Sequence, residues 1–172
     1  MAYVKNADQL LSHGNINARK TALDIIEYAL AKADPDIATR ALVSIQDDIL
    51  HVAELKFDLA KYKRIYLLGA GKATYPIAKA LEDILGDRIG GGVIACKYGE
   101  EGTLSRAELI HASHPIADES GFEASQKALR LAAHTQKDDI VFGCITGGSS
   151  ALFPFPAEGI TLEEKKAANR LL

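Results

Sequence analysis

The chain has 172 residues, of which 48% are hydrophobic and 25% are charged, and its net charge at pH 7 is −3. This is the composition of an ordinary globular domain with a core of its own, and it excludes a disordered chain. The net negative charge argues against nucleic acid as a partner, and no run approaches the ~18 apolar residues of a membrane span.

The N-terminal part of the sequence is predicted to be helical. Asn6 begins a short helix, which Gly14 and Asn15 end, and a longer helix is expected over residues 16–33. Its apolar residues recur at three- and four-residue spacing, which predicts a single buried stripe. The stripe consists of Ala22, Ile25, Ile26, Ala29 and Leu30.

Residues 34–60 are expected to connect these helices to the core. The tripeptide Asp34-Pro35-Asp36 ends the second helix and starts a short third one over 36–44, because proline fits the first turn of a helix. Residues 49–58 alternate weakly between apolar and polar and predict one or two short strands. Residues 1–60 are thus a helical lead-in with short strands.

Residues 61–160 show short apolar strands that alternate with helices. The expected strands are 64–68, 93–96, 108–112 and 139–145, and the expected helices are 73–85 and 120–133. Strands that are apolar on both faces are typical of a parallel sheet covered on both sides. The predicted fold class is therefore α/β, a Rossmann-like three-layer sandwich with a mainly parallel sheet, preceded by N-terminal helices. Ligands of such folds bind beyond the carboxyl ends of the strands.

A last helix is predicted to start at Thr161 and to continue to Leu172. Because no C-terminal cap follows it, we expect residues 1–172 to be the N-terminal α/β domain of a longer protein, with the C-terminal domain absent. An exposed last helix and an unpaired sheet edge would favour a homodimer of such a piece.

A glycine-rich turn, Gly69-Ala70-Gly71-Lys72-Ala73, stands between the first strand of the core and the helix that follows. Glycine lets the backbone approach an anion, the N–H groups of the helix's first turn can bind phosphate, and Lys72 adds a positive charge. The turn departs from the Walker A pattern at Tyr66 and Ala73, and from the dinucleotide fingerprint at Thr74. An anion-binding turn and a purely structural turn with a solvated lysine are both open.

A second glycine turn, Thr146-Gly147-Gly148-Ser149-Ser150-Ala151, follows the last strand of the core. Its backbone N–H groups and hydroxyls could cradle a phosphate, and a structural turn is the alternative. A nucleophilic Ser149 or Ser150 is disfavoured, because the sequence has nothing like the Gly-x-Ser-x-Gly elbow.

A polar loop after the third strand contains His114 and Asp118. The two side chains could line the ligand cleft, or Asp118 or Ser120 could cap the next helix. His111, within the strand, is expected to be a hydrogen-bonded core residue. His111 and His114 lie three residues apart with no third ligand in view, so we expect no metal site formed by these residues.

Cysteine usage and the N-terminus point to the cytoplasm. Cys96 and Cys144 lie in separate apolar stretches without CxxC or metal-type spacing, so we expect buried, reduced thiols. The N-terminus lacks the apolar region of a secretory signal. The expected location is therefore cytoplasmic.

The order of these motifs resembles the glycerate 2-kinases, the family whose C-terminal part is called the MOFRL domain and some of whose members carry the older name hydroxypyruvate reductase. The resemblance spans about Ala7 to Leu172. It rests on the first glycine turn, the His114-Pro115 loop with Asp118 and Gly121, Asp138-Asp139 before the last strand, the second turn through Leu152, and Pro156, Gly159-Ile160-Thr161-Leu162 and Lys165.

The resemblance implies ATP-dependent phosphorylation of D-glycerate to 2-phosphoglycerate with Mg²⁺, in a cleft between two α/β domains. Lys72 would then be the catalytic lysine, which stabilises charge on the transferred phosphoryl group. Gly69, Gly71 and Lys72 would hold substrate or nucleotide together with the second turn, that is, Gly147, Gly148, Ser149 and Ser150. His114 and Asp118 would edge the same cleft. The partners would be small molecules, namely glycerate and a nucleotide.

Departures from the family pattern leave alternatives open. The family usually has glycine where Ser149 stands and proline where Ala117 stands, and a 172-residue piece is expected to be catalytically incomplete. One alternative is an NAD(P)H-dependent hydroxypyruvate reductase, against which Gly90-Gly91-Gly92 stands where a ribose-binding acid is expected. Another is a non-catalytic module that binds sugar phosphates.

Overall fold

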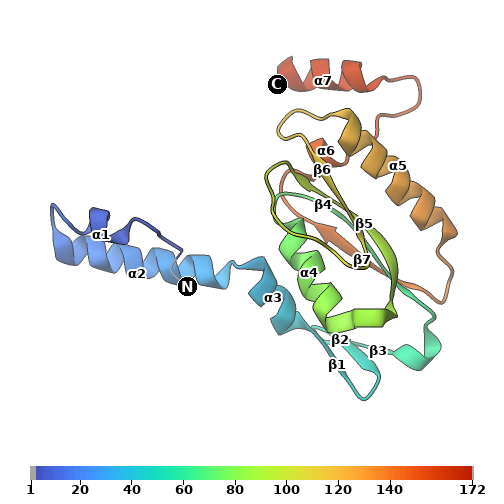
Figure 1. Ribbon diagram of the computed structural model, residues 1–172, viewed down its shortest axis with the longest axis horizontal. Coiled ribbons are helices and arrows are strands. Elements are labelled where there is room, and N and C mark those ends of the chain that lie inside the picture. Colours follow the sequence, from blue (N-terminus) through green and yellow to red (C-terminus); the bar gives the residue numbers. More distant parts are fainter. Residues whose placement is uncertain (1–2, 172) are drawn as a thin grey trace.

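The computed structural model describes residues 3–171 and shows a helical arm attached to an α/β body (Figure 1). Met1, Ala2 and Leu172, which fall within the predicted lead-in and last helix, lie outside the described residues. The arm consists of α1 (Ala7–Leu10) and α2 (Ile16–Lys32), and α3 (Pro35–Leu42) connects it to the body. The Asn15 side chain caps α2 by accepting the Ala18 N–H at 3.1 Å, and Asp34 caps α3 in the same way.

The predicted buried stripe of the second helix is wrong, although the helix itself is confirmed. None of its residues is buried, and Ile25 is 64% exposed. In the part of the chain that the structure describes, the helix extends away from the sheet (Figure 1). The N-terminal segment lies along it, because the Tyr3 and Val4 N–H groups both donate to the Glu27 carboxylate.

A three-stranded antiparallel sheet follows α3, and one of its strands was not predicted. The strands are β1 (Val43–Gln46), β2 (Ile49–Val52) and β3 (Leu55–Asp58), in the order β1-β2-β3. The third helix, predicted over 36–44, therefore ends at Leu42. Asp47 and Asp48 form the β1–β2 turn with φ angles of 49° and 61°, the left-handed conformation that tight hairpins require.

The central sheet has four strands, all parallel: β4 (Ile65–Ala70), β5 (Ile89–Lys97), β6 (Glu108–Ala112) and β7 (Ile140–Ile145). Their order is β6-β5-β4-β7, so β4 lies between β5 and the edge strand β7. The predicted parallel sheet and α/β class are confirmed. The strand predicted from Val93 begins at Ile89, because Ile89, Gly91 and Gly92 pair with β4, whereas Gly90 lies at a break in the register.

Two layers cover the sheet. On one face α4 (Thr74–Leu85) and the small sheet enclose a core of large aliphatic side chains, including Leu50, Leu67, Leu81 and Ile94. On the other face α5 (Glu119–His134) and the short α6 (Ser149–Leu152) pack through smaller residues such as Ala95, Ala124 and Ala128. Single 3₁₀ turns, η1 (Leu59–Lys61) and η2 (Gly86–Arg88), precede β4 and β5, and α7 (Leu162–Leu171) lies beyond α6.

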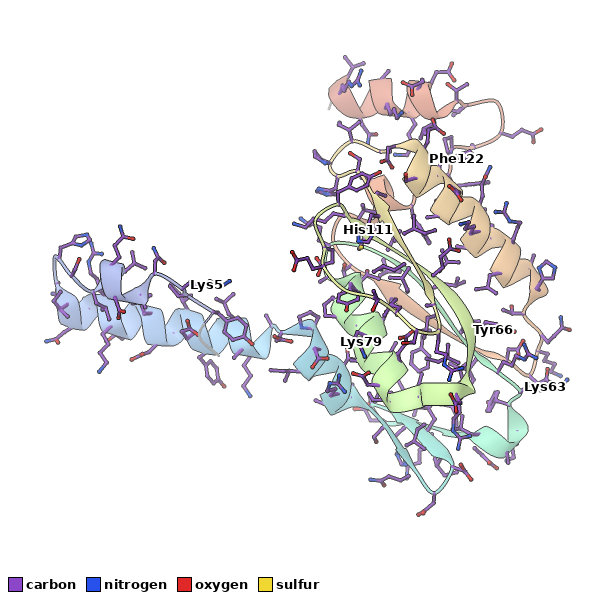
Figure 2. All side chains as sticks on the ribbon, viewed as in Figure 1. Lys5, Lys63, Tyr66, Lys79, His111 and Phe122 are labelled. Carbon is purple, nitrogen blue, oxygen red and sulfur yellow. The ribbon has the colours of Figure 1, made fainter. Side chains whose placement is uncertain are left out.

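The two ends of the sheet can be followed in Figure 2, where Lys63 lies at the amino end and His111 toward the carboxyl end. The carboxyl end is where both glycine turns begin, because β4 and β7 run in the same direction. Of the helices in residues 3–171, none combines the length and apolar character that crossing a bilayer requires.

Candidate phosphate-binding site

Parallel pairing of β4 with β7 brings the two glycine turns together. Gly69 lies opposite Cys144, and Ala70 lies opposite Ile145, in adjacent strands. Beyond the strands the Lys72 N–H donates to the Gly147 carbonyl at 3.0 Å, and the Thr146 N–H donates to the Ala70 carbonyl at 3.1 Å. The two motifs, far apart in the sequence, form one continuous backbone surface.

Gly71 is required where the turns touch. It has a φ of +144°, and a Cβ at this position would lie 1.9 Å from the Thr146 hydroxyl oxygen. That hydroxyl oxygen in turn accepts the Ala73 N–H at 3.1 Å. Thr146 was part of the predicted motif but was given no role. The structure shows that its side chain joins the turns.

The first turn of α4 offers fewer backbone donors than the sequence suggested. The Ala73 N–H is bonded to Thr146, the Thr74 N–H contacts the Gly71 carbonyl at 3.4 Å, and Pro76 has no N–H. The buried Thr74 hydroxyl donates to the Cys144 carbonyl at 3.0 Å. Binding of an anion here would therefore depend on the Lys72 charge more than on the helix end.

Lys72, Gly148 and His114 meet at the centre of the site. The Lys72 side chain is exposed, and its stem passes close to Gly148. Gly148 has a φ of +96°, and a Cβ there would lie 2.9 Å from the His114 ring and 3.4 Å from Lys72 Cγ. The structure thus brings together three of the predicted site residues, one from each of three loops.

Asp118 has the capping role that the sequence left open. One carboxylate oxygen accepts the Gly121 N–H at 2.9 Å at the start of α5, and the other accepts the Tyr98 hydroxyl at 3.0 Å. The Tyr98 hydroxyl also lies 3.2 Å from Ser120 Oγ. Tyr98 was not predicted, although its place directly after β5 at the carboxyl end of the sheet is the signal that could have found it.

Ser149 and Ser150 begin the helix α6, where the sequence predicted a turn. The Ser149 N–H lies 3.3 Å from the Thr146 carbonyl, and the Ser150 carbonyl accepts Lys165 Nζ at 3.3 Å. Ser149 is half-buried and Ser150 is exposed. The second turn is therefore compact, with Gly147 exposed at its outer end.

The remaining reactive side chains have structural environments. Burial raises the pKa of the Cys144 thiol to about 11, and burial with the nearby Glu100 charge raises that of Cys96 to about 11. Both cysteines are free and buried, as expected. His111 is half-buried, and its Nε2 lies 3.0 Å from the Glu100 carbonyl. Within residues 3–171 no three His, Cys, Asp or Glu side chains are grouped to hold a metal ion.

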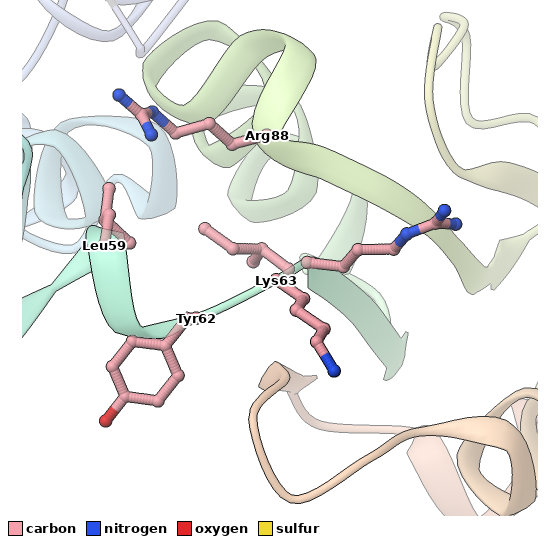
Figure 3. A pocket seen from close by; sticks show the side chains of 6 residues that line it. Leu59, Tyr62, Lys63 and Arg88 are labelled. Atoms are coloured by element: carbon pink, nitrogen blue, oxygen red, sulfur yellow. The ribbon is translucent and has the colours of Figure 1, made fainter.

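A small pocket at the opposite end of the sheet is not part of this site (Figure 3). Its volume is about 60 Å³, too small for a nucleotide. Two of its cations are already paired, Lys63 with Asp138 and Arg88 with Asp48. The pocket is lined by Leu59, Tyr62, Lys63, Arg64, Ile65 and Arg88.

Comparison with known proteins finds a matching family model and several similar proteins. Residues 21–172 match the family model described as a domain of unknown function, DUF4147. The chain is 37% identical over 157 residues to the glycerate 2-kinase of Pyrococcus horikoshii, covering 91% of this chain and 35% of that protein. It is 38% identical over 109 residues to a putative hydroxypyruvate reductase of Agrobacterium vitis, covering 63% of this chain and 28% of that protein.

A solved structure shares the fold. The crystal structure of glycerate kinase from Thermotoga maritima superposes with a TM-score of 0.71 at 30% identity, over 88% of this chain and 33% of that one. The chain therefore spans about a third of the length of the relatives that it matches.

Proposed function

We propose that this chain, which belongs to the DUF4147 family and is related to its glycerate kinases, supplies the phosphate-holding part of an enzyme that phosphorylates D-glycerate to 2-phosphoglycerate. The observation that carries the proposal is the meeting of Lys72, Gly148 and His114 on the joined glycine turns. Phosphoryl transfer needs positioning and positive charge more than covalent chemistry, and this arrangement offers both.

Each group has a specific task in this proposal. ATP would supply the phosphoryl group. The Lys72 side chain is exposed and its stem passes beside Gly148, and its ammonium would neutralise charge on the transferred group. Gly69 and Gly71 keep β4 close to β7, and Gly147 and Gly148, with Ser149 and Ser150, present backbone and hydroxyl groups at the same edge. The His114 ring lies over Gly148, where it would donate to a phosphate or a hydroxyl of the substrate.

Within the described residues 3–171, no group of three His, Cys, Asp or Glu side chains offers a ready-made metal site. Magnesium prefers one or two carboxylates together with phosphate oxygens and water, and each oxygen of Asp118 already accepts one hydrogen bond, from the Gly121 N–H and from the Tyr98 hydroxyl. Mg²⁺ therefore enters the proposal only as the companion of ATP, and no step is assigned to it.

The test measures 2-phosphoglycerate formed from Mg-ATP and D-glycerate by the longest gene product that contains this sequence. We expect Lys72→Ala to lower kcat by about 10²-fold or more, since such electrostatic groups contribute on that scale. Lys61→Ala is the matched control, because Lys61 is an exposed lysine before the amino end of β4, and it should keep wild-type activity.

Two other outcomes would replace the proposal. Oxidation of NADH or NADPH by hydroxypyruvate, without phosphorylation of glycerate, would establish the reductase. The structure does not favour this reaction, because β5 ends at Lys97, where a dinucleotide-binding fold is expected to have a ribose-binding carboxylate. Saturable binding of sugar phosphates with no nucleotide binding would establish the non-catalytic module.

The compartment and the oligomeric state are part of the same proposal. Free, buried Cys96 and Cys144 suit a reducing cytoplasm. The edge strand β7 exposes 44% of Val141 and 61% of Ile145, a surface that a homodimer could cover. Sedimentation at increasing concentration should show dimers, and a monomer throughout would contradict this arrangement.

A further inference from the structure

The connection from β5 to β6 is a loop, residues 98–107, without a helix of its own. Because the two strands are parallel, this β5–β6 loop must return from the carboxyl end of the sheet to its amino end. It does so along α4, with Leu104 and Ala107 packed into the aliphatic core on that face. Its first half, from Tyr98 to Thr103, starts at the carboxyl end of the sheet, where the glycine turns also begin, and is mostly exposed.

A buried carboxylate on α4 holds the second half of this loop. Glu82 is only 7% exposed, and its carboxylate accepts three consecutive backbone N–H groups of the loop. The donors are Ser105 at 2.8 Å, Arg106 at 2.7 Å and Ala107 at 2.9 Å. In residues 3–171 no cationic side chain forms an ion pair with Glu82, so these N–H groups compensate the buried charge.

The first half of the loop meets α4 two helical turns earlier, at Tyr75. A Cβ at Gly102 would lie 2.0 Å from the Tyr75 hydroxyl oxygen, so the loop backbone rests directly on that side chain. Tyr75 and Glu82 are seven residues apart and share one face of the helix. The Gly71 N–H donates to the Ala95 carbonyl of β5 at 3.1 Å, so the loop leaves β5 next to the first glycine turn, which carries Lys72.

We propose that Glu82 is a positioning residue, which anchors the β5–β6 loop along α4 so that the segment around Gly102 forms one wall of the phosphate site beside Lys72. The inference rests on the proposed function. Glu82 itself does not touch the substrates. Its carboxylate fixes where the loop returns, and the contact of Gly102 with Tyr75 fixes how closely the loop approaches the first glycine turn.

The experiment compares Glu82→Gln with wild type in the kinase assay and in hydrogen–deuterium exchange. A glutamine keeps one acceptor oxygen, which can still bind the Arg106 and Ala107 N–H groups, but it places an NH₂ donor where the second carboxylate oxygen accepts the Ser105 N–H. The Ser105 amide should therefore exchange about tenfold faster or more. We expect KM for at least one substrate to rise about threefold or more with little change in kcat, the opposite of Lys72→Ala. Asp83→Asn, the neighbouring carboxylate on the same helix, is the control and should leave both readouts unchanged.

Gly102→Ala tests the wall separately from the anchor. The new methyl group would collide with Tyr75, so KM should rise as in Glu82→Gln while Ser105–Ala107 remain protected. Unchanged KM in both variants of an active enzyme, or unchanged exchange in Glu82→Gln, would overturn the inference. If the wild-type enzyme phosphorylates no glycerate but Glu82→Gln still speeds exchange in the loop, the proposed function is overturned and the role of Glu82 as the anchor of the loop stands.

Discussion

Helices α2 and α4 have apolar residues at similar spacing but different surroundings. α4 lies against β4, β5 and the small sheet and buries six of its residues, among them Ala78, Leu81 and Leu85. α2 buries none, and Ile25 and Ile26 are 64% and 45% exposed. The spacing of apolar residues therefore predicts a helix, whereas burial of those residues depends on a packing partner elsewhere in the chain.

Cavity-creating substitutions should separate the two helices most strongly. Leu81→Ala removes a 2% exposed side chain from the aliphatic core and should lower the free energy of unfolding by about 2–5 kcal/mol. Ile25→Ala should change it by no more than about 0.5 kcal/mol. Urea unfolding monitored by circular dichroism measures both, and a large loss in Ile25→Ala would show that α2 is packed in solution.

Threonine hydroxyls give a smaller version of the same contrast. Thr74→Val at the start of α4 removes the donor to the buried Cys144 carbonyl and should cost about 1–2 kcal/mol. Thr21→Val on α2 loses only a bond from an exposed hydroxyl to the Asn17 carbonyl and should be nearly neutral. Equal losses in urea unfolding would mean that the junction between the glycine turns is not rigid.

The smallest effect is expected from the carboxylate that joins α4 to α3. Side-chain hydrogen bonds from Lys79 and Arg40, together with their charges, lower the pKa of Asp83, which is 39% exposed. Its contribution, about 0.2–1 kcal/mol after solvent screening, is present above the ordinary pKa of 3.8 and is lost as the pH falls through the lower folded value. Asp83→Asn should therefore be less stable than wild type at pH 7, and the difference in the free energy of unfolding, measured by urea unfolding, should shrink as the pH falls below 3.8. Asp24→Asn on α2 is the control and should match wild type at pH 7.

The sequence predicted the body better than its edges. Short apolar strands between helices predicted all four strands of the parallel sheet, because a short apolar run bounded by glycines and polar residues indicates a strand. The start of β1 was assigned to the helix predicted before it. The hairpin was missed because its β1–β2 turn consists of two aspartates rather than the usual glycine. The four-residue α6 is too short to have a periodicity of its own.

The candidate site was predicted in outline and corrected in detail. Glycines after two strands predicted where the backbone could approach a ligand closely, and in the structure backbone hydrogen bonds join those two turns. Thr146 and Tyr98 could not be ranked from sequence, because their roles depend on partners that pairing of the strands brings into reach. Asp118 was open between cap and ligand contact; its bond to the Gly121 N–H confirms the cap, and a contact with the ligand stays a prediction.

The junction between the glycine turns also bears on how the protein is made. Ala73 and Thr146, which it connects, are 73 residues apart, whereas α4 and its neighbouring strands form from local contacts. Closing such a distance is among the slower events of folding, so a chain emerging from the ribosome has no site until β7 has been synthesised and has paired with β4. A ligand that binds the joined turns would then favour completion of the last stage of folding.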